Sequence, residues 1–446
     1  MQPQFDLTLS ADVPLGGTCL LPGDKSLSHR AALFAALAEG ESVIDRFLVS
    51  GVTHAMLNAL DALGIVWHLD GSRLTVQGRG LRGFTPPAAP LDCGNSATTI
   101  RLLAGALAAA GTPCTLDGSA GLRRRPMDRI TAPLLRMGVP ITSSDGCAPL
   151  TLAARAAPHP LTAVDETLPV ASAQVKSCLI LAALAADGES TLREPGPSRD
   201  HTERMLAAMG ADIRVEGRAV TVAPLLQPLT PLRMTLPGDI SSAAFLLVAA
   251  ALVPGSELCV RDVGVNPTRT GILDVLREMG ARITVENPRV VAGEPVGDIR
   301  LVAAPLQAVR VGGDTVVRMI DEFPVFAVAA CFASGVTEVH DAEELRYKET
   351  DRISVLCGEL KVLGVQVAER RDGFTIKGGT LAGGACDAHG DHRLAMSLAL
   401  AGLAAPAPVT VHHAEILNES FPGFVEQLRE LGVSVRAGSK ESSESK

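Results

Sequence analysis

The amino-acid sequence predicts an α/β protein of two domains, each made of three similar units that bury their helices inside outer sheets. Three observations predict this architecture. The 446 residues exceed what a single hydrophobic core usually spans. The motif Leu-x-x-(Leu/Met)-Gly recurs six times, about 70 to 80 residues apart. A small polar cluster followed by a run of alanines and leucines precedes each copy.

The recurring motif is typical of the end of an amphipathic helix. In residues 202–217 (TERMLAAMGADIRVEG), apolar residues at helical spacing stop at Gly210, and an alternating strand pattern follows. Chance similarity among leucine-rich helices explains the copies less well, because a polar cluster also recurs at a similar distance upstream of each copy. The six copies span residues 60–64, 134–138, 206–210, 276–280, 360–364 and 428–432.

The alanine- and leucine-rich runs predict a second helix in every unit. These runs are apolar on nearly all faces, as expected of helices inside a domain. A proline-rich tract at residues 224–239 separates the third unit from the fourth and predicts a crossover between the domains. The runs begin with DKSLSHR, GNSATT, SAQVKS, DISSAA, DEFPVF and DHRLAM.

The composition argues against several classes of function. A formal charge of −9 and only 3% aromatic residues argue against nucleic acid as a partner. The nine cysteines show no metal-like spacing and are expected to be reduced and mostly buried. The longest apolar run, residues 243–253, is too short to cross a bilayer, and the N-terminus lacks a signal peptide, so we expect a cytoplasmic protein. The polar end at residues 438–446 is expected to be disordered.

Basic residues gather where the buried helices are predicted to start. Helix N-termini favour anions, so this placement predicts a cleft between the domains for a ligand with several negative groups, such as phosphate plus carboxylate. Taken alone, a basic residue of this kind is more often a solvated surface charge than a ligand contact. The basic residues are Lys25, Arg30, Arg101, Arg123, Arg124, Arg125, Lys176, Arg199, Lys348, Arg352 and Arg393.

Acidic residues lie among these cations in the second half of the chain. Asp321, Glu322 and Glu349 suit proton transfer with Lys348 nearby. The alternative is a structural lattice of ion pairs, which is the preferred interpretation for Asp351.

The stretch around Lys25 is not the phosphate loop of nucleotide hydrolases. That loop needs lysine directly after its second glycine, and here Asp24 intervenes between Gly23 and Lys25. Gly17 also lies one position too far upstream, and no Gly-x-Gly-x-x-Gly opens a helix elsewhere. ATPase and dinucleotide-binding functions are therefore rejected.

Eight motifs in order resemble those of the 5-enolpyruvylshikimate-3-phosphate synthase family: LPGDKSLSHR, GNSATTIR, RRRPM, ASAQVKS, SRDHTE, DEFP, YKETDR and DHR. The resemblance extends from residue 21 to about residue 424. It implies the enolpyruvyl transferase fold, an inside-out α/β barrel of six βαβαββ-like repeats in two lobes. One lobe would be residues 20–235, and the other residues 1–19 with 236–437.

The resemblance also implies an activity. Members of the family transfer the enolpyruvyl group of phosphoenolpyruvate to the 5-hydroxyl of shikimate 3-phosphate, releasing phosphate, on the route to aromatic amino acids. They use no metal and no organic cofactor. A monomer is expected from the habit of the family.

Site residues follow from the matched motifs, by resemblance. Those implied to bind shikimate 3-phosphate are Lys25, Ser26, Arg30, Ser172, Ala173, Gln174, Arg199, Asp321 and Lys348. Those implied to bind phosphoenolpyruvate are Lys25, Ala97, Arg125, Gln174, Arg352 and Arg393, with the backbone of residues 95–97. The implied catalytic residues are Asp321, Glu349, Lys25 and Lys348. Asp321 would take the hydroxyl proton, and Glu349, with both lysines nearby, would supply and later remove a methyl proton.

Two positions depart from the pattern of many members. Ala97 stands where they have a glycine in the phosphoenolpyruvate pocket; with SAQVKS and SRDHTE, this resembles the glyphosate-tolerant second class and predicts weak inhibition by glyphosate. Glu419 stands where they have a lysine that touches phosphoenolpyruvate, and no role is assigned to it.

Two alternatives stay open beside this hypothesis. The sister transferase acting on UDP-N-acetylglucosamine shares the fold, but it carries Lys-Asn where this chain has Lys25-Ser26, and it uses a loop cysteine whose context Cys114 lacks. A non-catalytic anion-binding protein of the same fold would tolerate loss of Asp321, Glu349 or Arg352, and all three are present.

Overall fold

A computed structural model describes residues 5–155, 160–379 and 381–439 of the chain. The chain divides into two compact units. Unit 1 contains the chain up to Pro22, Gly238–Arg289 and the chain from Val296 onward. Unit 2 contains Gly23–Pro237 and the short segment Val290–Pro295.

Unit 2 holds three four-stranded sheets with the orders β14-β3-β5-β4, β6-β7-β9-β8 and β10-β11-β13-β12. In each sheet the first two strands are parallel, and the later pairs are antiparallel. The strands are β3 (Glu39–Asp45), β4 (Val66–Asp70), β5 (Arg73–Arg79), β6 (Leu91–Asp92), β7 (Cys114–Asp117), β8 (Ile141–Ser144), β9 (Cys147–Leu152), β10 (Asp165–Thr167), β11 (Ser190–Arg193), β12 (Ile213–Glu216), β13 (Ala219–Val222) and β14 (Arg233–Thr235).

Unit 1 repeats this pattern in the orders β2-β15-β17-β16, β18-β19-β21-β20 and β22-β23-β1-β24. The N-terminal strand completes the last of these sheets, because Leu7 lies opposite Ala437 on one side and Val411 on the other. The strands are β1 (Phe5–Ser10), β2 (Gly16–Leu20), β15 (Glu257–Gly264), β16 (Arg282–Val291), β17 (Glu294–Val302), β18 (Arg310–Val311), β19 (Val336–Val339), β20 (Gln366–Arg370), β21 (Gly373–Lys377), β22 (Gly384–Asp387), β23 (Val409–His412) and β24 (Ser434–Ser439).

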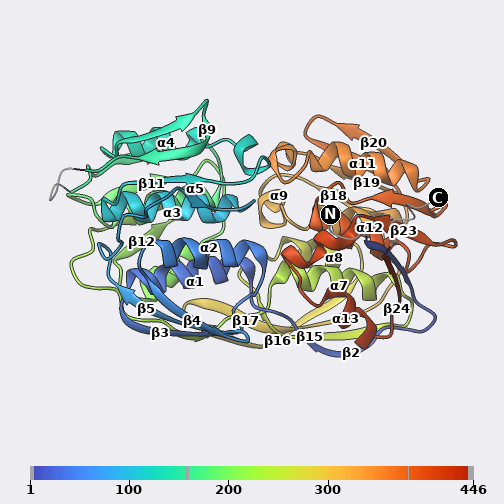
Figure 1. The fold of residues 1–446 in the computed structure, drawn as a ribbon. Helices are drawn as coiled ribbons and strands as arrows, with labels where there is room; N and C mark the ends of the chain where they lie inside the picture. Colours follow the sequence, from blue (N-terminus) through green and yellow to red (C-terminus); the bar gives the residue numbers. More distant parts are fainter. Residues whose placement is uncertain (1–4, 156–159, 380, 440–446) are drawn as a thin grey trace, which may run out of the picture. The chain divides into compact units, whose positions relative to one another are not determined.

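The alanine- and leucine-rich helices form the interior of each unit. All residues of α7 are buried, and α3 and α5 pack so closely that a Cβ on Gly105 would lie 2.2 Å from the carbonyl oxygen of Cys178. In Figure 1, α1, α3 and α5 run side by side within unit 2, between the strands β3 to β5 and the strand β9. The interior helices are α1 (Lys25–Leu37), α3 (Ala97–Ala110), α5 (Ala173–Ala183), α7 (Ile240–Leu252), α10 (Phe323–Cys331) and α12 (His392–Ala401).

The glycines of the six recurring motifs all have positive φ, between +80° and +103°, which L-residues rarely adopt. Each glycine follows the last turn of a helix and turns the chain toward the next strand, so the predicted six helix-to-strand units are confirmed. The helices are α2 (Gly51–Ala62), α4 (Asp128–Arg136), α6 (His201–Ala208), α8 (Gly271–Glu278), α11 (Arg352–Val362) and α13 (Phe424–Glu430). The short helices are α9 (Asp314–Arg318), η1 (Leu122–Arg124), η2 (Glu343–Tyr347) and η3 (Ala414–Glu419).

Unit 2 spans Gly23–Pro237 instead of the predicted residues 20–235, and the structure differs from the predicted bounds in two further places. The tip of the β16–β17 hairpin, residues 290–295, groups with unit 2, because Val291 and Ala292 pack against the core of that unit. The predicted tail at residues 438–446 starts too early, because β24 continues to Ser439 by pairing with β1. Residues 440–446 lie outside the described part of the chain.

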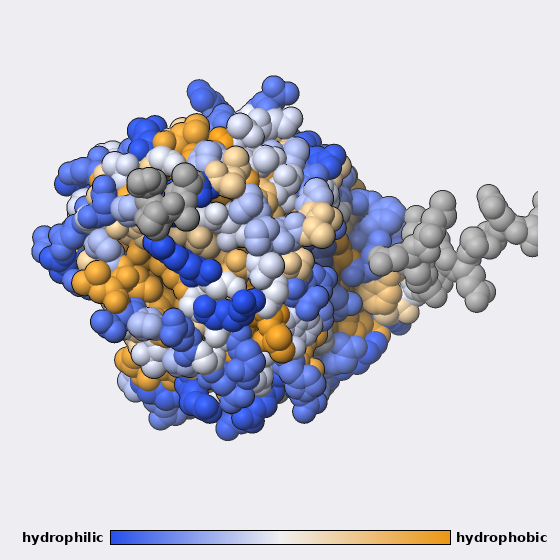
Figure 2. Space-filling model, turned by 60° about the vertical axis from the view of Figure 1, so that its left-hand side comes forward, coloured by the Kyte–Doolittle hydropathy of each residue, from blue (hydrophilic) through white to orange (hydrophobic). Residues whose placement is uncertain are grey.

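The surface, the helix lengths and the burial of the cysteines agree with what the composition predicts. Hydrophilic residues cover most of the side drawn in Figure 2, and the apolar residues there form small separate groups. No helix among the described residues is long and apolar enough to span a membrane. Seven of the nine cysteines are buried, as expected, and Cys147 and Cys259 are half-buried.

Candidate functional site

The first stretch of interest, Gly23–Lys25, begins α1 in unit 2. Asp24 is the N-cap: its side chain accepts a 2.8 Å hydrogen bond from the backbone N–H of Leu27. Gly23 is needed for close packing, because a Cβ there would lie 1.9 Å from the carbonyl oxygen of Arg46. A side chain at this position would therefore clash with the backbone at Arg46. Lys25 and Ser26 follow, both half-buried.

Arg30 lies one turn further along α1 and is 2% exposed. Its Nε donates to Thr202 Oγ1 at 2.8 Å, its Nη2 to Ser177 Oγ at 2.9 Å and its Nη1 to the carbonyl oxygen of Ser26 at 3.1 Å. Among the described residues it forms no ion pair. Burial lowers the pKa of Arg30 to about 10, and nearby carboxylates, Glu203 first, act in the opposite direction. A buried guanidinium held only by neutral oxygens is a suitable partner for an anion.

His29 connects the starts of α1 and α3. Burial lowers the pKa of His29 to about 4, so the ring is neutral near pH 7 and carries one N–H. Nδ1 lies 2.8 Å from the carbonyl oxygen of Lys25. Nε2 lies 3.2 Å from the carbonyl oxygen of Val52 and 3.3 Å from Ser96 Oγ. Because Ser96 caps α3, His29 fixes the two helix starts relative to each other.

Gln174 on α5 is held in one orientation by α3. Its Oε1 accepts from Arg101 Nη1 at 2.5 Å, and its Nε2 donates to Thr98 Oγ1 at 2.9 Å. Arg101 also donates to the carbonyl oxygen of Pro126 at 3.0 Å, next to Arg125. The second N–H of the Gln174 amide therefore has a defined direction. The sequence placed Arg101 among the cations at helix starts but assigned it no specific ligand contact.

The other predicted residues of unit 2 also lie at helix starts. Ser172 is the N-cap residue of α5 without a side-chain capping bond, and Ala173 is the first residue of that helix. Ala97 begins α3 and is 4% exposed. Arg125 follows η1, and Arg199 precedes α6 by two residues; both are half-buried.

Lys176 does not belong with the ligand-facing cations. Its Nζ lies 2.7 Å from a carboxylate oxygen of Glu194 and 2.7 Å from one of Glu203, and the lysine is 1% exposed. The sequence placed it near a helix start, but the side chain points into a buried ion-pair cluster. Two neighbouring carboxylates raise the pKa of Lys176, although burial lowers it. The lysine is therefore a structural cation.

A second cluster, in unit 1, surrounds Arg352, the first residue of α11. Arg352 is 1% exposed; its Nε donates to Asp391 Oδ2 at 2.7 Å and its Nη2 to Glu349 Oε2 at 2.6 Å. Asp321 Oδ1 lies 3.6 Å from Nη1, which forms no hydrogen bond within the described residues. Burial opposes the charged form, but these carboxylates raise the pKa of Arg352. The charge of this arginine is compensated within unit 1, unlike that of Arg30.

Arg393 and Lys348 complete this cluster. Arg393 Nη1 donates to the backbone carbonyl oxygen of Asp321 at 3.2 Å, and Nη2 lies 4.0 Å from Asp321 Oδ2. Burial lowers the pKa of Lys348, with Asp321 acting against this shift and Arg352 adding to it. A lysine with a lowered pKa beside carboxylates is suited to proton transfer.

Asp391 is a site residue that sequence reasoning missed. It is fully buried, caps α12 through the N–H of Arg393 at 2.9 Å, and binds Arg352. The signal was present in the DHR motif, in which the aspartate directly precedes the arginine. Asp351, in contrast, caps α11 and accepts from Arg346 at 2.7 Å, as expected of a structural carboxylate.

Glu322 and Glu419 lie near the cluster, with different surroundings. Glu322 is 1% exposed and accepts from the Ser241 hydroxyl, so it is a buried structural acid and not an exposed proton donor. Glu419 Oε2 lies 3.7 Å from His392 Nδ1, next to Arg393. Within the described residues, no group of three or more histidine, cysteine, aspartate or glutamate side chains is placed to hold a metal ion.

The fold and the two clusters together define a class of α/β enzymes built of six repeats. In these enzymes one unit has buried cations at the starts of its interior helices, and the other unit has a lysine paired with carboxylates. The family model described as EPSP synthase (3-phosphoshikimate 1-carboxyvinyltransferase) matches residues 9–428. The chain belongs to this family, and it is a transferase. The family and the fold predicted from the motifs are thus confirmed.

Relatives resemble the chain over nearly its whole length. A 3-phosphoshikimate 1-carboxyvinyltransferase of Methylococcus capsulatus is 46% identical, covering 94% of this chain and 95% of the relative. One of Syntrophomonas wolfei is 48% identical, covering 95% and 98%. The solved EPSP synthase of Acinetobacter baumannii is 39% identical, with a TM-score of 0.87 over 98% of this chain and all of that one.

Proposed function

We propose that this chain transfers the enolpyruvyl group of phosphoenolpyruvate to the 5-hydroxyl of shikimate 3-phosphate, with release of phosphate. The observation that carries the proposal is the contrast between the two buried arginines. Arg30 is bound only by neutral oxygens, and Arg352 is bound by three carboxylates beside a lysine of lowered pKa. The first arrangement favours binding an anion, and the second favours moving protons.

Unit 2 supplies the groups that bind substrate anions. Arg30 and Ser26 bind shikimate 3-phosphate with Arg199 and the start of α5, where Ser172, Ala173 and Gln174 present N–H and hydroxyl groups. Lys25, Arg125 and the start of α3 at Ala97 bind phosphoenolpyruvate. The positive ends of helices α3 and α5 favour the negative groups of both substrates.

Unit 1 supplies the proton-transfer groups. Asp321 accepts the proton of the 5-hydroxyl as its oxygen bonds to the central carbon of phosphoenolpyruvate. Glu349 donates a proton to the methylene carbon. In the second step Glu349, with the amine of Lys348 beside it, takes a proton back from the resulting methyl carbon, the carbon–oxygen bond to phosphate breaks, and phosphate leaves with the bonding electrons. Arg352 and Arg393 hold Asp321 and Glu349 and bind phosphoenolpyruvate.

Phosphate release in the presence of both substrates tests this proposal. We expect stoichiometric phosphate and a product heavier than shikimate 3-phosphate by one enolpyruvyl group in mass spectrometry. Turnover with UDP-N-acetylglucosamine in place of shikimate 3-phosphate would favour the sister transferase. Binding of both substrates without phosphate release would favour an anion-binding protein.

The protein is further proposed to be a cytoplasmic monomer. Its acidic composition and its membership of a family of biosynthetic transferases support this. Light scattering after size-exclusion chromatography tests the oligomeric state, with a mass near 46.3 kDa expected.

A further inference from the structure

Three of the five N–H groups of the buried Arg30 guanidinium are used by the protein itself. Thr202 takes the single Nε–H, Ser177 takes one hydrogen of Nη2, and the Ser26 carbonyl takes one of Nη1. One N–H on each terminal nitrogen remains, a pair with the geometry for two oxygens of one anion. The direction of this pair depends on the oxygens that hold the other three hydrogens.

The two hydroxyls that hold Arg30 also bind each other. Ser177 Oγ lies 2.6 Å from Thr202 Oγ1, and Ser177 donates to the carbonyl oxygen of Ala173 at 2.6 Å. With its hydrogen given to Ala173, Ser177 can accept from both Arg30 and Thr202. Thr202 then donates to Ser177 and accepts from Arg30. The hydroxyl hydrogen bonds thus run in one consistent direction, from Thr202 on α6 to Ser177 and then to the carbonyl oxygen of Ala173 on α5.

Three consecutive residues at the start of α6 are fixed by three different segments. His201 Nδ1 lies 2.7 Å from Glu294 Oε1, Thr202 binds Arg30, and Glu203 binds Lys176 at 2.7 Å. All three are at most 4% exposed. A displacement of this turn therefore moves the oxygen that orients Arg30.

Glu294 comes from the hairpin tip, residues 290–295, more than 90 positions from α6 in sequence. It is 1% exposed. A second contact ties the tip to the helix, because Arg204 Nη1 donates to the carbonyl oxygen of Gly293 at 3.2 Å. The hairpin tip therefore holds the first turn of α6 through two separate contacts.

We propose that Thr202 is a positioning residue for Arg30, and that Glu294 of the hairpin tip acts on Arg30 through His201 and the first turn of α6. This inference rests on the proposed role of Arg30 in binding shikimate 3-phosphate. Neither residue touches substrate. Both set the direction of the two remaining guanidinium N–H groups, so both affect binding of the phosphorylated substrate and not the chemical step.

Thr202→Val tests the role of the hydroxyl, because valine keeps the shape and removes the acceptor. We expect KM for shikimate 3-phosphate to rise about tenfold, the size of one charge-assisted hydrogen bond, with kcat within about twofold. Thr202→Ser is expected to restore KM, and Glu294→Gln to raise it about threefold. Thr131→Val, at a buried threonine of α4, is the matched control and should leave KM unchanged.

A substrate-independent readout separates this inference from the proposed function. In protein labelled with 15N-arginine, the Arg30 Nε–H is assigned by its loss in Arg30→Lys, and its exchange with solvent should quicken about tenfold in Thr202→Val. If the wild-type enzyme were inactive but its Arg30 Nε–H still exchanged more slowly than that of Thr202→Val, only the proposed function would be overturned. Unchanged KM and unchanged Nε–H exchange in Thr202→Val would overturn the inference, and a normal KM in Glu294→Gln would remove the hairpin tip from it.

Discussion

Arg352 and Asp391 form a buried ion pair in unit 1: Nε lies 2.7 Å from Oδ2, and the two side chains are 1% and 0% exposed. Burial would raise the pKa of Asp391, but Arg352 holds it below its usual range. The pair fixes α11 to α12, because Arg352 begins one helix and Asp391 caps the other. Removing either partner leaves the other charge in the interior with less compensation.

Asp391→Asn is therefore expected to destabilise the protein and to slow it. The amide keeps the shape and can still cap α12, but Arg352 loses the charge of its one fully buried carboxylate partner among the described residues. We expect a loss of about 3 kcal/mol in the free energy of unfolding and about a hundredfold drop in kcat. Urea denaturation and steady-state kinetics measure the two effects. Asp351→Asn, at a half-exposed pair with Arg346, is the control, and an equal loss in both variants would contradict the special place of Asp391.

The lowered pKa of Lys348 leads us to expect that turnover depends on pH. Because burial lowers its pKa in the folded protein, the neutral amine that can accept a proton appears at lower pH than for a free lysine. We expect kcat to rise with pH through this lowered pKa, and the rising limb to vanish in Lys348→Met. Stability should also rise with pH between the lowered pKa and the ordinary one, since the unfolded chain there binds more protons. An unchanged pH profile in Lys348→Met would exclude this role.

Ala97 predicts the response to glyphosate. Its methyl group lies at the first turn of α3, where the residue is 4% exposed. In the proposed site this turn lines the phosphoenolpyruvate pocket, so the methyl group would narrow the space for an inhibitor that fills that pocket. We expect weak inhibition of the wild-type enzyme and much stronger inhibition of Ala97→Gly, at similar KM for shikimate 3-phosphate. Titration of the phosphate-release rate with glyphosate decides the matter, and micromolar inhibition of the wild type would refute the prediction.

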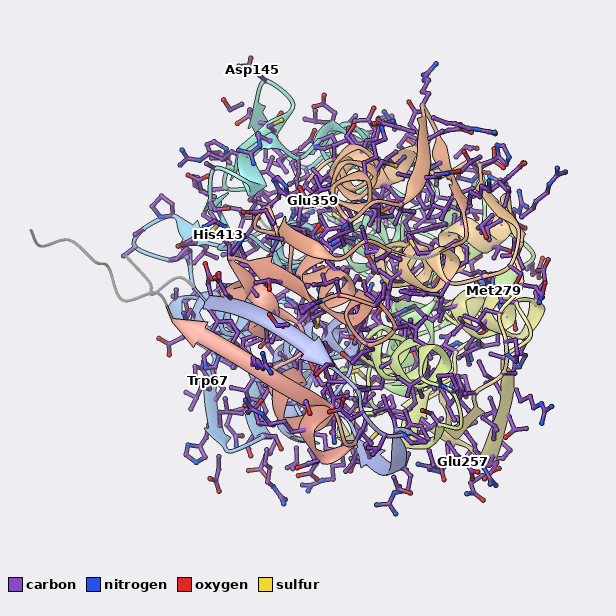
Figure 3. The ribbon with its side chains drawn as sticks, turned by 90° about the vertical axis from the view of Figure 1, so that its right-hand side faces the viewer. Trp67, Asp145, Glu257, Met279, Glu359 and His413 are labelled. Carbon is purple, nitrogen blue, oxygen red and sulfur yellow. The ribbon has the colours of Figure 1, made fainter. Side chains whose placement is uncertain are left out.

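Asp387, at the end of β22, predicts loss of stability in acid. Burial acts to raise its pKa, but the N–H of His389 at 2.6 Å and the ring of His413 at 2.6 Å lower it overall. His389 also binds Glu359, which is labelled with His413 in Figure 3. A lowered carboxyl pKa stabilises the fold above the unfolded value, and this is lost as pH falls through the folded value. Asp387→Asn should flatten the acid limb of Tm against pH; an identical limb would contradict this.

The repeat architecture could be predicted because short sequence patterns determine its repeated helices and turns. Each helix end needs a glycine of positive φ, and each interior helix needs apolar residues on all faces, so six copies of both signals suffice. Motif order then identified the family. The hairpin tip at 290–295 could not be assigned to unit 2, because its packing against that core has no periodic signal.

The partners of the charged residues could not be predicted, since they depend on contacts far apart in sequence. Arg30 and Thr202 are separated by 172 positions, and Arg352 and Asp391 by 39. Lys176 resembled the ligand-facing cations in its place along the chain, but two buried carboxylates bind it. The residue type and the helix start were foreseeable, and the direction of each side chain was not.

In the proposed reaction the chain performs enolpyruvyl transfer with Asp321 as the proton acceptor. Its most direct test is the rate of phosphate release from phosphoenolpyruvate and shikimate 3-phosphate by the wild type and by Asp321→Ala, with folding checked by circular dichroism. We expect rapid release by the wild type and a decrease of about a thousandfold in the folded variant, the size of a lost general base. No release by the wild type, or an equal rate in the variant, would contradict the account.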